Sequence, residues 1–347
     1  MMKSKEEPME NPKSIYERSV VIDMTCPAAV KDRILRDYRD GGLTAIAVTA
    51  GYGMKVPRRT PLRHTEETMA MWTERIRTRD DLVLVTSVKD IYRAKSEGKL
   101  GIILHFQGTR PFEGEIKNIG MFYKTGLRVC QLCYNVKDLA GCGCTVEEDT
   151  GLTEFGGLVV AEANRLGVLV DCAHTGAKTT LDAIDASSSP VIISHGNARA
   201  VHDNDRNLND DVVKAIAKNG GVIGINGFPS FVSKSFRPSL DEFIDHIDHI
   251  VRLAGVEHVG LGIDYFEYQA AYCNTLLAKF VYRYLLAGGA WNSSNYAPPP
   301  WHYPQEIETP LHLGTLSDGL SRRGFSPENI ASILGGNILR VYGQVWK

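Results

Sequence analysis

Two histidines and one aspartate stand directly after short apolar runs in the second half of the chain. His174 ends "GVLVDCAH", His195 ends "PVIISH" and Asp264 ends "HVGLGID". Two imidazoles and a carboxylate can hold a divalent metal ion and activate its water. The same side chains could instead form ordinary hydrogen bonds at the starts of loops. Residue types and spacing leave both interpretations open.

A barrel of parallel strands would bring these side chains together. Short β-branched runs alternate with amphipathic stretches from residue 19 to about residue 264, which is typical of repeated strand–helix units. The sequence therefore predicts an α/β protein with a (β/α)8 TIM barrel, whose active groups stand at the carboxyl ends of the strands. The strand candidates, eight in number, are 19–23, 43–50, 101–107, 127–134, 167–174, 190–195, 221–227 and 258–264. A ninth run, 82–88, is expected to be a short edge strand or an insertion.

The elements around the barrel also have sequence signatures. Ser239 and Glu242 have capping-box spacing at the start of a helix that should stop at Gly255. A last helix is expected from Ser326 onward, with Pro327 at its first position. The Pro- and aromatic-rich stretch 290–306 should be a long loop near the barrel mouth. We expect a polar N-terminal extension over 1–18 and one barrel domain over 19–347.

Composition excludes some classes of partner. The net charge of −2 supplies no basic face for a phosphate backbone, so we expect no nucleic acid partner. The polar residues 1–18 contain no signal-like apolar run, and no later run approaches the roughly twenty residues of a membrane span. We therefore expect a cytoplasmic protein with no membrane partner, and seven cysteines that remain reduced thiols.

From about residue 19 to residue 345 the chain resembles the membrane (renal) dipeptidase family, with matching stretches over most of its second half. The matching stretches include "GLTEFGGLVVAEANRLGVLVDCAHTG", "PVIISHGNARAVHDNDRNLND", "GGVIGINGFPSF" and "DHIDHIVRLAGVEHVGLGIDYF". The resemblance implies a single (β/α)8 domain, commonly a homodimer. It also implies a zinc-dependent hydrolase that acts on dipeptides or related small amides bearing a carboxylate.

The resemblance assigns roles to several residues. His174 and His195 fall where the family has the two histidines of one zinc ion. Arg206 falls where an arginine grips the substrate carboxylate, although it could also be a solvated residue of a polar loop. Asp264 falls where a carboxylate orients or deprotonates the attacking water. Tyr134 stands in place of a histidine that polarises the scissile carbonyl.

One further strand-end residue, Asn226, is expected at the substrate. Its amide could hydrogen-bond to a ligand at the barrel mouth.

The metal site departs from the family pattern. The resemblance places Thr25 and Pro27 where a histidine and an aspartate should stand, and Gln107 where a bridging glutamate should stand. A neutral amide coordinates weakly and cannot bridge two cations, so we expect at most one zinc or other divalent ion per chain, or none.

Two neighbours could act as substitute ligands. Cys26 could offer a thiolate, although an isolated cysteine is more often a small buried apolar residue. His105 should face the barrel interior one layer below Gln107, where a buried hydrogen-bonded group is the simpler interpretation. Structural zinc at Cys130/Cys133 or Cys142/Cys144 has little support.

Three functional hypotheses follow. The first is a dipeptidase-family hydrolase with an altered metal centre. The second is a lyase, isomerase or cyclising enzyme that keeps the pocket and uses Asp264, Tyr134 and Cys26 for proton transfer. The third is a non-catalytic protein that binds a small carboxylate.

Overall fold

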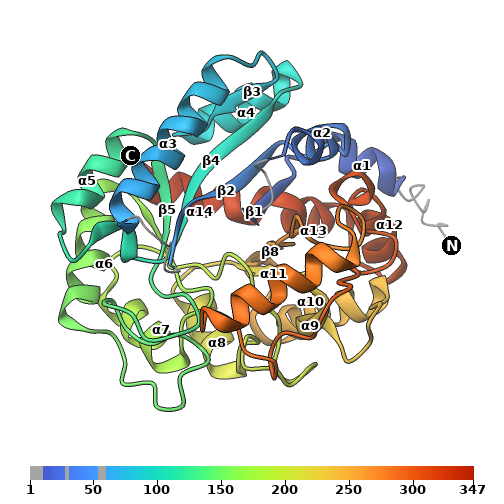
Figure 1. The fold of residues 1–347 in the computed structure, drawn as a ribbon. Helices are drawn as coiled ribbons and strands as arrows, with labels where there is room; N and C mark the ends of the chain where they lie inside the picture. The colour runs from blue at the N-terminus through green and yellow to red at the C-terminus, as the bar shows by residue number, and fades with distance from the viewer. Residues whose placement is uncertain (1–10, 28–30, 54–59) are drawn as a thin grey trace, which may run out of the picture.

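The computed structural model describes residues 11–27, 31–53 and 60–347, and its centre is a ring of parallel strands surrounded by helices (Figure 1). Strand neighbours follow the order β6, β5, β4, β2, β1, β8 and β7. The strands are β1 (Ile22–Cys26), β2 (Ala45–Tyr52), β3 (Leu82–Leu84), β4 (Leu100–Gln107), β5 (Leu127–Gln131), β6 (Leu169–Asp171), β7 (Ile223–Ile225) and β8 (Val259–Leu261).

The predicted strand 190–195 closes the ring between β6 and β7. It forms isolated parallel bridges from Ile192 to Asp171 and from Ile193 to Ile223. The Cys172 N–H donates to Ile192 O over 2.8 Å. Since β1 pairs with β8, the predicted (β/α)8 barrel is confirmed. The short strand β3 pairs with β4 off the main path, as an edge strand does.

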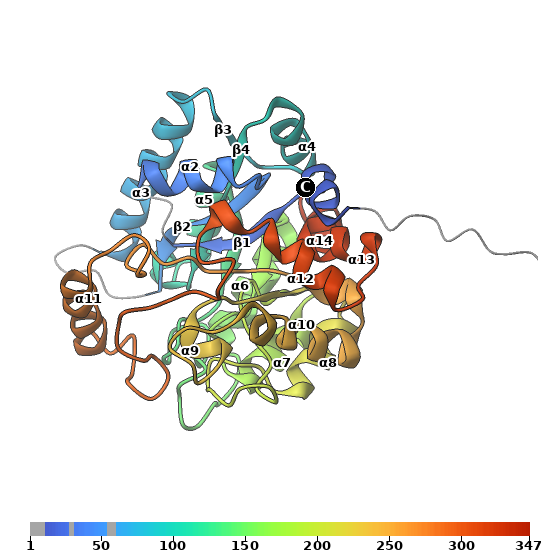
Figure 2. The same cartoon turned by 90° about the vertical axis from the view of Figure 1, so that its right-hand side faces the viewer.

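Helices surround the barrel and lie at both of its ends (Figure 2). They are α1 (Pro12–Arg18), α2 (Asp32–Asp40), α3 (Pro61–Arg77), α4 (Val88–Glu97), α5 (Lys117–Lys124), α6 (Glu154–Leu166), α7 (Ala177–Ala186), α8 (Asp210–Lys218), α9 (Pro229–Val232), α10 (Leu240–Ala254), α11 (Thr275–Ala287), α12 (Thr315–Arg322), α13 (Pro327–Ala331) and α14 (Asn337–Val345). Short 3-10 turns lie at Arg110–Phe112, Val256–His258 and Pro310–His312, and a π-helical turn lies at Ser332–Gly336.

The predicted helix signals are present. In α10, Ser239 and Glu242 form both halves of a capping box. The predicted last helix begins with Ser326 as its cap, but a π-helical turn divides it into α13 and α14. A Cβ on Gly335 in this turn would lie 2.3 Å from Val20 O, so a close backbone approach requires the glycine.

The expected polar extension over 1–18 contains α1 among its described residues. Ile15 and Tyr16 of α1 are buried, and the Tyr16 hydroxyl donates to Gly41 O over 2.8 Å. This helix therefore packs on the body of the protein. No helix in the described part of the chain is long and apolar enough to cross a membrane.

The barrel interior is closed at one end by the C-terminal helix. Ile338 and Tyr342 of α14 join the same buried cluster as Ile22 and Ala45, near the starts of β1 and β2. Figure 2 shows α14 and α11 at opposite ends of the barrel. The end near α11 is therefore where a site can open.

Candidate active site

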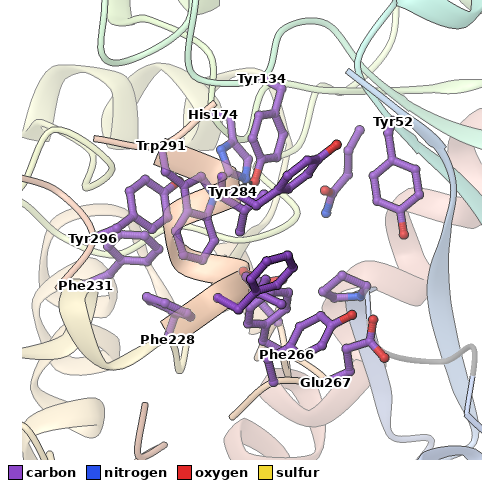
Figure 3. A pocket seen from close by; sticks show the side chains of 17 residues that line it. Tyr52, Tyr134, His174, Phe228, Phe231, Phe266, Glu267, Tyr284, Trp291 and Tyr296 are labelled. Carbon is purple, nitrogen blue, oxygen red and sulfur yellow. Dashed lines mark hydrogen bonds between the residues drawn. The ribbon is translucent and has the colours of Figure 1, made fainter. Parts of the chain in front are cut away.

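A cavity of about 430 Å³ opens at the carboxyl ends of the strands, and aromatic side chains form most of its wall (Figure 3). Five of the predicted site residues line it: Pro27, Gln107, Tyr134, His174 and Asp264. The remaining lining residues are Tyr52, Phe228, Phe231, Phe266, Glu267, Tyr268, Phe280, Val281, Tyr284, Leu285, Trp291 and Tyr296. The loop 290–306 contributes Trp291 and Tyr296 to this wall.

Strained backbone aims side chains at the site. Asn135, His174 and Asp264 have φ values of 59°, 59° and 61°, in the left-handed region that residues other than glycine rarely adopt. Such conformations cost about 1–3 kcal/mol each and persist where the surrounding structure imposes them. Each of the three follows a barrel strand, where the chain turns sharply at the mouth.

A hydrogen bond fixes the orientation of His174. Its Nδ1 lies 2.6 Å from the Asn135 Oδ1. An amide oxygen only accepts, so this contact places the imidazole proton on Nδ1 and leaves Nε2 with a lone pair. Burial, followed by the positive charge of Arg206, holds the pKa of His174 well below its usual value. The ring is therefore neutral, as a metal-ligating imidazole must be.

A buried relay fixes His195 in the same tautomer. Ser194 Oγ donates to the Asp171 Oδ2 over 2.5 Å and lies 2.7 Å from the His195 Nδ1. Because the hydroxyl proton is committed to the carboxylate, Ser194 accepts from Nδ1–H. The His195 Nε2 is buried and has no hydrogen-bond partner among the described residues. Its lone pair is available to a ligand.

The two imidazoles are suited to sharing one metal ion. Their ring centroids lie 4.7 Å apart, and both Nδ1 atoms are held by outer hydrogen-bond partners. Metal-ligating histidines usually have such partners. Within the described ranges no cluster of three or more His, Cys, Asp or Glu side chains could hold a metal. The residues thus fit a single ion that would take further ligands from water or substrate.

An uncharged hydrogen bond occupies the other side of the expected metal centre. The Gln107 Nε2 donates to Thr25 Oγ1 over 3.1 Å, and both side chains are buried. Pro27 lines the cavity beside them and has no side-chain ligand atom. These three residues do not fit a second metal ion.

The proposed substitute ligands lie away from the cavity wall. Cys26 is buried in the same hydrophobic cluster as Tyr38 and is not among the residues that line the cavity. His105 is fully buried, and its Nε2 lies 3.1 Å from the Asp171 Oδ2. His105 therefore joins the relay that ends at His195. No disulfide links any of the seven cysteines, all of which lie within the described residues.

Tyr134 is placed to donate a hydrogen bond. Its ring stacks on His174 with centroids 4.1 Å apart, and the Trp291 Nε1 donates to its hydroxyl over 3.2 Å. Burial raises the pKa of Tyr134 to about 12. The phenol keeps its proton near neutral pH and can donate it to a ligand oxygen.

Asp264 is placed to accept a proton. The Asn226 Nδ2 donates to its Oδ2 over 3.3 Å. Burial raises the pKa of Asp264 to about 7, although the charge of Arg206 and the Asn226 hydrogen bond oppose the rise. A carboxylate with this pKa can exchange a proton near neutral pH.

Arg206 is a buried cation with unused donors. Arg206 is only 2% exposed, and its Nε and Nη2 atoms have no hydrogen-bond partner in the described part of the chain. The guanidinium carbon lies 5.2 Å from the Phe231 ring centroid. Arg206 lines a neighbouring cavity of about 200 Å³ rather than the main one, and His174 lines both. The solvated interpretation of Arg206 is wrong.

Sequence reasoning missed the residues that support the histidines and most of the aromatic wall. Asn135 directly follows Tyr134, and Ser194 directly precedes His195, so adjacency to a candidate ligand was the available signal. The signal for the wall was the mostly apolar segment "TLLAKFVYRYLLA", which became α11.

Comparisons with known proteins agree with this fold. A model of the membrane dipeptidase family (peptidase family M19) matches residues 22–277. An uncharacterized dipeptidase of Schizosaccharomyces pombe is 35% identical over 193 residues, which cover 54% of this chain and 46% of that protein. Dipeptidase 3 of Rattus norvegicus is 28% identical over 271 residues, which cover 76% of this chain and 48% of that protein. The chain spans about half the length of the curated relatives it matches.

Solved structures extend the likeness to nearly the whole chain. The structure of an amidohydrolase from Pseudomonas aeruginosa has a TM-score of 0.85 and 29% identity, and the match covers 97% of this chain and 99% of that one. A metallo peptidase from Rhodobacter sphaeroides, solved with a phosphinate mimic of L-Ala-D-Ala, shares the fold at a TM-score of 0.75 and 19% identity. The chain belongs to the membrane dipeptidase family.

Proposed function

We propose that this protein is a hydrolase that cleaves an amide bond in a small carboxylate-bearing molecule, at a centre with at most one divalent metal ion. One observation carries the proposal. His174 and His195 both have Nδ1 held by a hydrogen bond, so both can present Nε2 to one ion, and the His195 Nε2 is a buried atom without a partner among the described residues. Zinc is the family's metal and suits imidazole ligands.

The surrounding residues supply the rest of the chemistry. A divalent ion held by the two histidines would act as a Lewis acid toward the amide carbonyl. Tyr134, whose phenol keeps its proton, donates a hydrogen bond to the carbonyl oxygen. Asp264 accepts the proton of the attacking water. The unused Nε and Nη2 donors of Arg206 suit a bidentate contact with a substrate carboxylate.

The Thr25–Gln107 hydrogen bond sets the expected metal count. A hydroxyl and a carboxamide are neutral, so nothing on that side of the centre offsets the charge of a second cation. Without a second ion no hydroxide can bridge two metals. We therefore expect ordinary L,L and L,D dipeptides to be hydrolysed poorly.

Metal-dependent hydrolysis tests the proposal. Protein stripped with a chelator and reloaded with zinc should cleave some carboxylate-bearing amides. The variants His174→Ala and His195→Ala should lose this cleavage and should no longer retain zinc. His249→Ala is the matched control, because His249 pairs with Asp210 away from the cavity. Binding of a carboxylate without any hydrolysis would favour a non-catalytic protein. Conversion without hydrolysis would favour a lyase, isomerase or cyclising enzyme. The expected homodimer and cytoplasmic location stay predictions.

A further inference from the structure

An exposed apolar stripe runs along α11 next to the main cavity. Leu276, Phe280 and Tyr284 are 81%, 69% and 53% exposed, and Leu277 is 44% exposed. The first three follow one another at a spacing of four residues, so they lie on one face of the helix. Large apolar side chains grouped on one face usually mark a binding surface.

The helix that carries this stripe is firmly attached. Its opposite face buries Ala278 and Tyr282, which are 2% and 8% exposed. The Tyr282 hydroxyl donates to Tyr296 O over 2.8 Å, and Asn274 caps the first turn through the Leu277 N–H. The exposed face is therefore a fixed surface of the protein.

The stripe continues into the cavity. Phe280 and Tyr284 belong to the cavity wall as well as to the exposed face, and Val281 and Leu285 line the wall beside them. Tyr284 stands opposite Tyr52 among the side chains around the cavity in Figure 3. Farther in, Trp291 stacks on Tyr296 with centroids 4.1 Å apart. We call the surface from Trp291 to Leu276 the apolar track.

The track does not suit the free ammonium group of a dipeptide. Among the described residues that line the cavity, Asp264 and Glu267 are the two carboxylates, and no lysine or arginine lines it. Glu267 already pairs with Lys31 over 3.1 Å. Asp264 lies near Arg206 and is the proposed proton acceptor. An ammonium group would lose hydration there and find no carboxylate reserved for it.

We propose that the substrate is an N-acyl amino acid whose long apolar acyl chain lies in the apolar track. This inference rests on the proposed function. Its carboxylate would address Arg206, and its amide would lie at His174. In the reaction, a water oxygen bonds to the acyl carbon and the C–N bond breaks. Both protons of the water end on the nitrogen, so the products are a fatty carboxylate and an amino acid with an ammonium group.

Ligand binding tests the track directly. We would titrate zinc-loaded full-length protein with N-alkylsulfonyl alanines, in which a sulfonamide that resists hydrolysis replaces the amide. Each buried methylene strengthens binding by about fourfold, so the octyl ligand should bind at least about a hundredfold more tightly than the methyl ligand. In the variants Phe280→Ser and Tyr284→Ser, the ratio of the octyl ligand's affinity to the methyl ligand's affinity should fall about tenfold.

The control is Leu158→Ser, because Leu158 on α6 is 52% exposed and lies outside the cavity wall. It should keep the wild-type ratio. Equal affinity for methyl and octyl ligands, or an unchanged ratio in both track variants, would overturn the proposal. The proposal would also be overturned if the wild type is a dimer and Phe280→Ser makes it a monomer without changing the affinity ratio. A second copy of the chain would then be what covers the stripe.

Hydrolysis of the matching N-acyl alanines separates this inference from the proposed function. Cleavage that rises with chain length supports both. Cleavage of N-acetylalanine that does not rise with chain length overturns the track and leaves the hydrolase standing. Chain-length-dependent binding of the sulfonamides without cleavage of any amide supports the track and overturns the hydrolase.

Discussion

Gln107 donates a hydrogen bond of 3.1 Å from its Nε2 to the Oγ1 of Thr25. Gln107 ends β4 and Thr25 lies near the end of β1, so they meet at the carboxyl ends of the strands, where Gln107 lines the same cavity as His174. Both stand where the family resemblance leads one to expect charged or imidazole metal ligands. The contact satisfies both side chains without any ion, so this half of the centre is complete as a neutral structure.

Gln107→Glu should destabilise the protein in the absence of metal. The change removes the Nε2–H donor and places a carboxylate at a residue that is 4% exposed. We expect the free energy of unfolding to fall by about 1–3 kcal/mol, measured by urea denaturation of chelator-treated protein. Gln305→Glu, at an exposed position, is the control. Equal stability of the two variants would show that the contact contributes nothing.

Ser194→Ala should weaken metal binding without unfolding the protein. Ser194 connects Asp171 to the His195 Nδ1, so its loss frees the ring to rotate and to change tautomer. Loss of such an outer partner typically costs 10–100-fold in metal affinity, which competition with a chromogenic chelator would measure. Ser317→Ala is the control, because Ser317 is fully buried and its hydroxyl has no partner among the described residues. Unchanged zinc affinity in Ser194→Ala would remove the relay from the account.

Arg206→Gln should weaken binding of carboxylated ligands selectively. Loss of a desolvated, charge-assisted pair costs about 2–5 kcal/mol, so the dissociation constant should rise at least tenfold. A ligand with a primary amide in place of the carboxylate should bind almost as before. The control is Arg199→Gln, which removes a half-exposed arginine paired with Asp203 and Asp205. Equal losses for both ligands would contradict the anchor role.

The sequence was sufficient to predict the barrel, because its strands are continuous apolar runs with recognisable ends. The predicted first and last residues of individual strands were less accurate. The run at 19–23 became β1 at Ile22–Cys26, and the run at 190–195 takes part only through bridges at Ile192 and Ile193. Hydrophobicity indicates burial, whereas the exact ladder depends on pairing with neighbours distant in the chain.

The candidate site was predictable in part. Strand ends and the resemblance identified His174, Tyr134 and Asp264, which the fold brings to one cavity. The sequence could not show that Thr25 and Gln107, 82 residues apart, would bond to each other. Nor could it show that α11 would extend the cavity wall, since apolar residues occupy more of this helix than the face that buries Ala278 and Tyr282.

Acid should destabilise the segment that carries His195 and Arg206. The buried His246 accepts from the Ala198 N–H at Nδ1 and contacts Val232 O at Nε2. Burial lowers the pKa of His246 to about 4, so the unfolded chain binds a proton that the folded protein resists. This contribution to stability is present above the ordinary histidine pKa of about 6.5. It is lost as the pH falls from there toward 4.

Urea denaturation at a series of pH values measures this effect. The unfolding free energy should fall by about 3 kcal/mol over that interval through His246 alone. His246→Gln should remove this share of the pH dependence, whereas His249→Gln on the same helix should keep it. An identical slope in His246→Gln and the wild type would assign the acid sensitivity to other groups.

Metal stoichiometry tests the central claim most directly. Full-length protein would be equilibrated with excess zinc, freed of unbound metal by gel filtration, and analysed for zinc per chain by inductively coupled plasma mass spectrometry. The uncharged contact between Gln107 and Thr25 predicts no more than one ion per chain, and His195→Ala should lower that value toward zero. Two zinc ions per chain in the wild type would contradict the account.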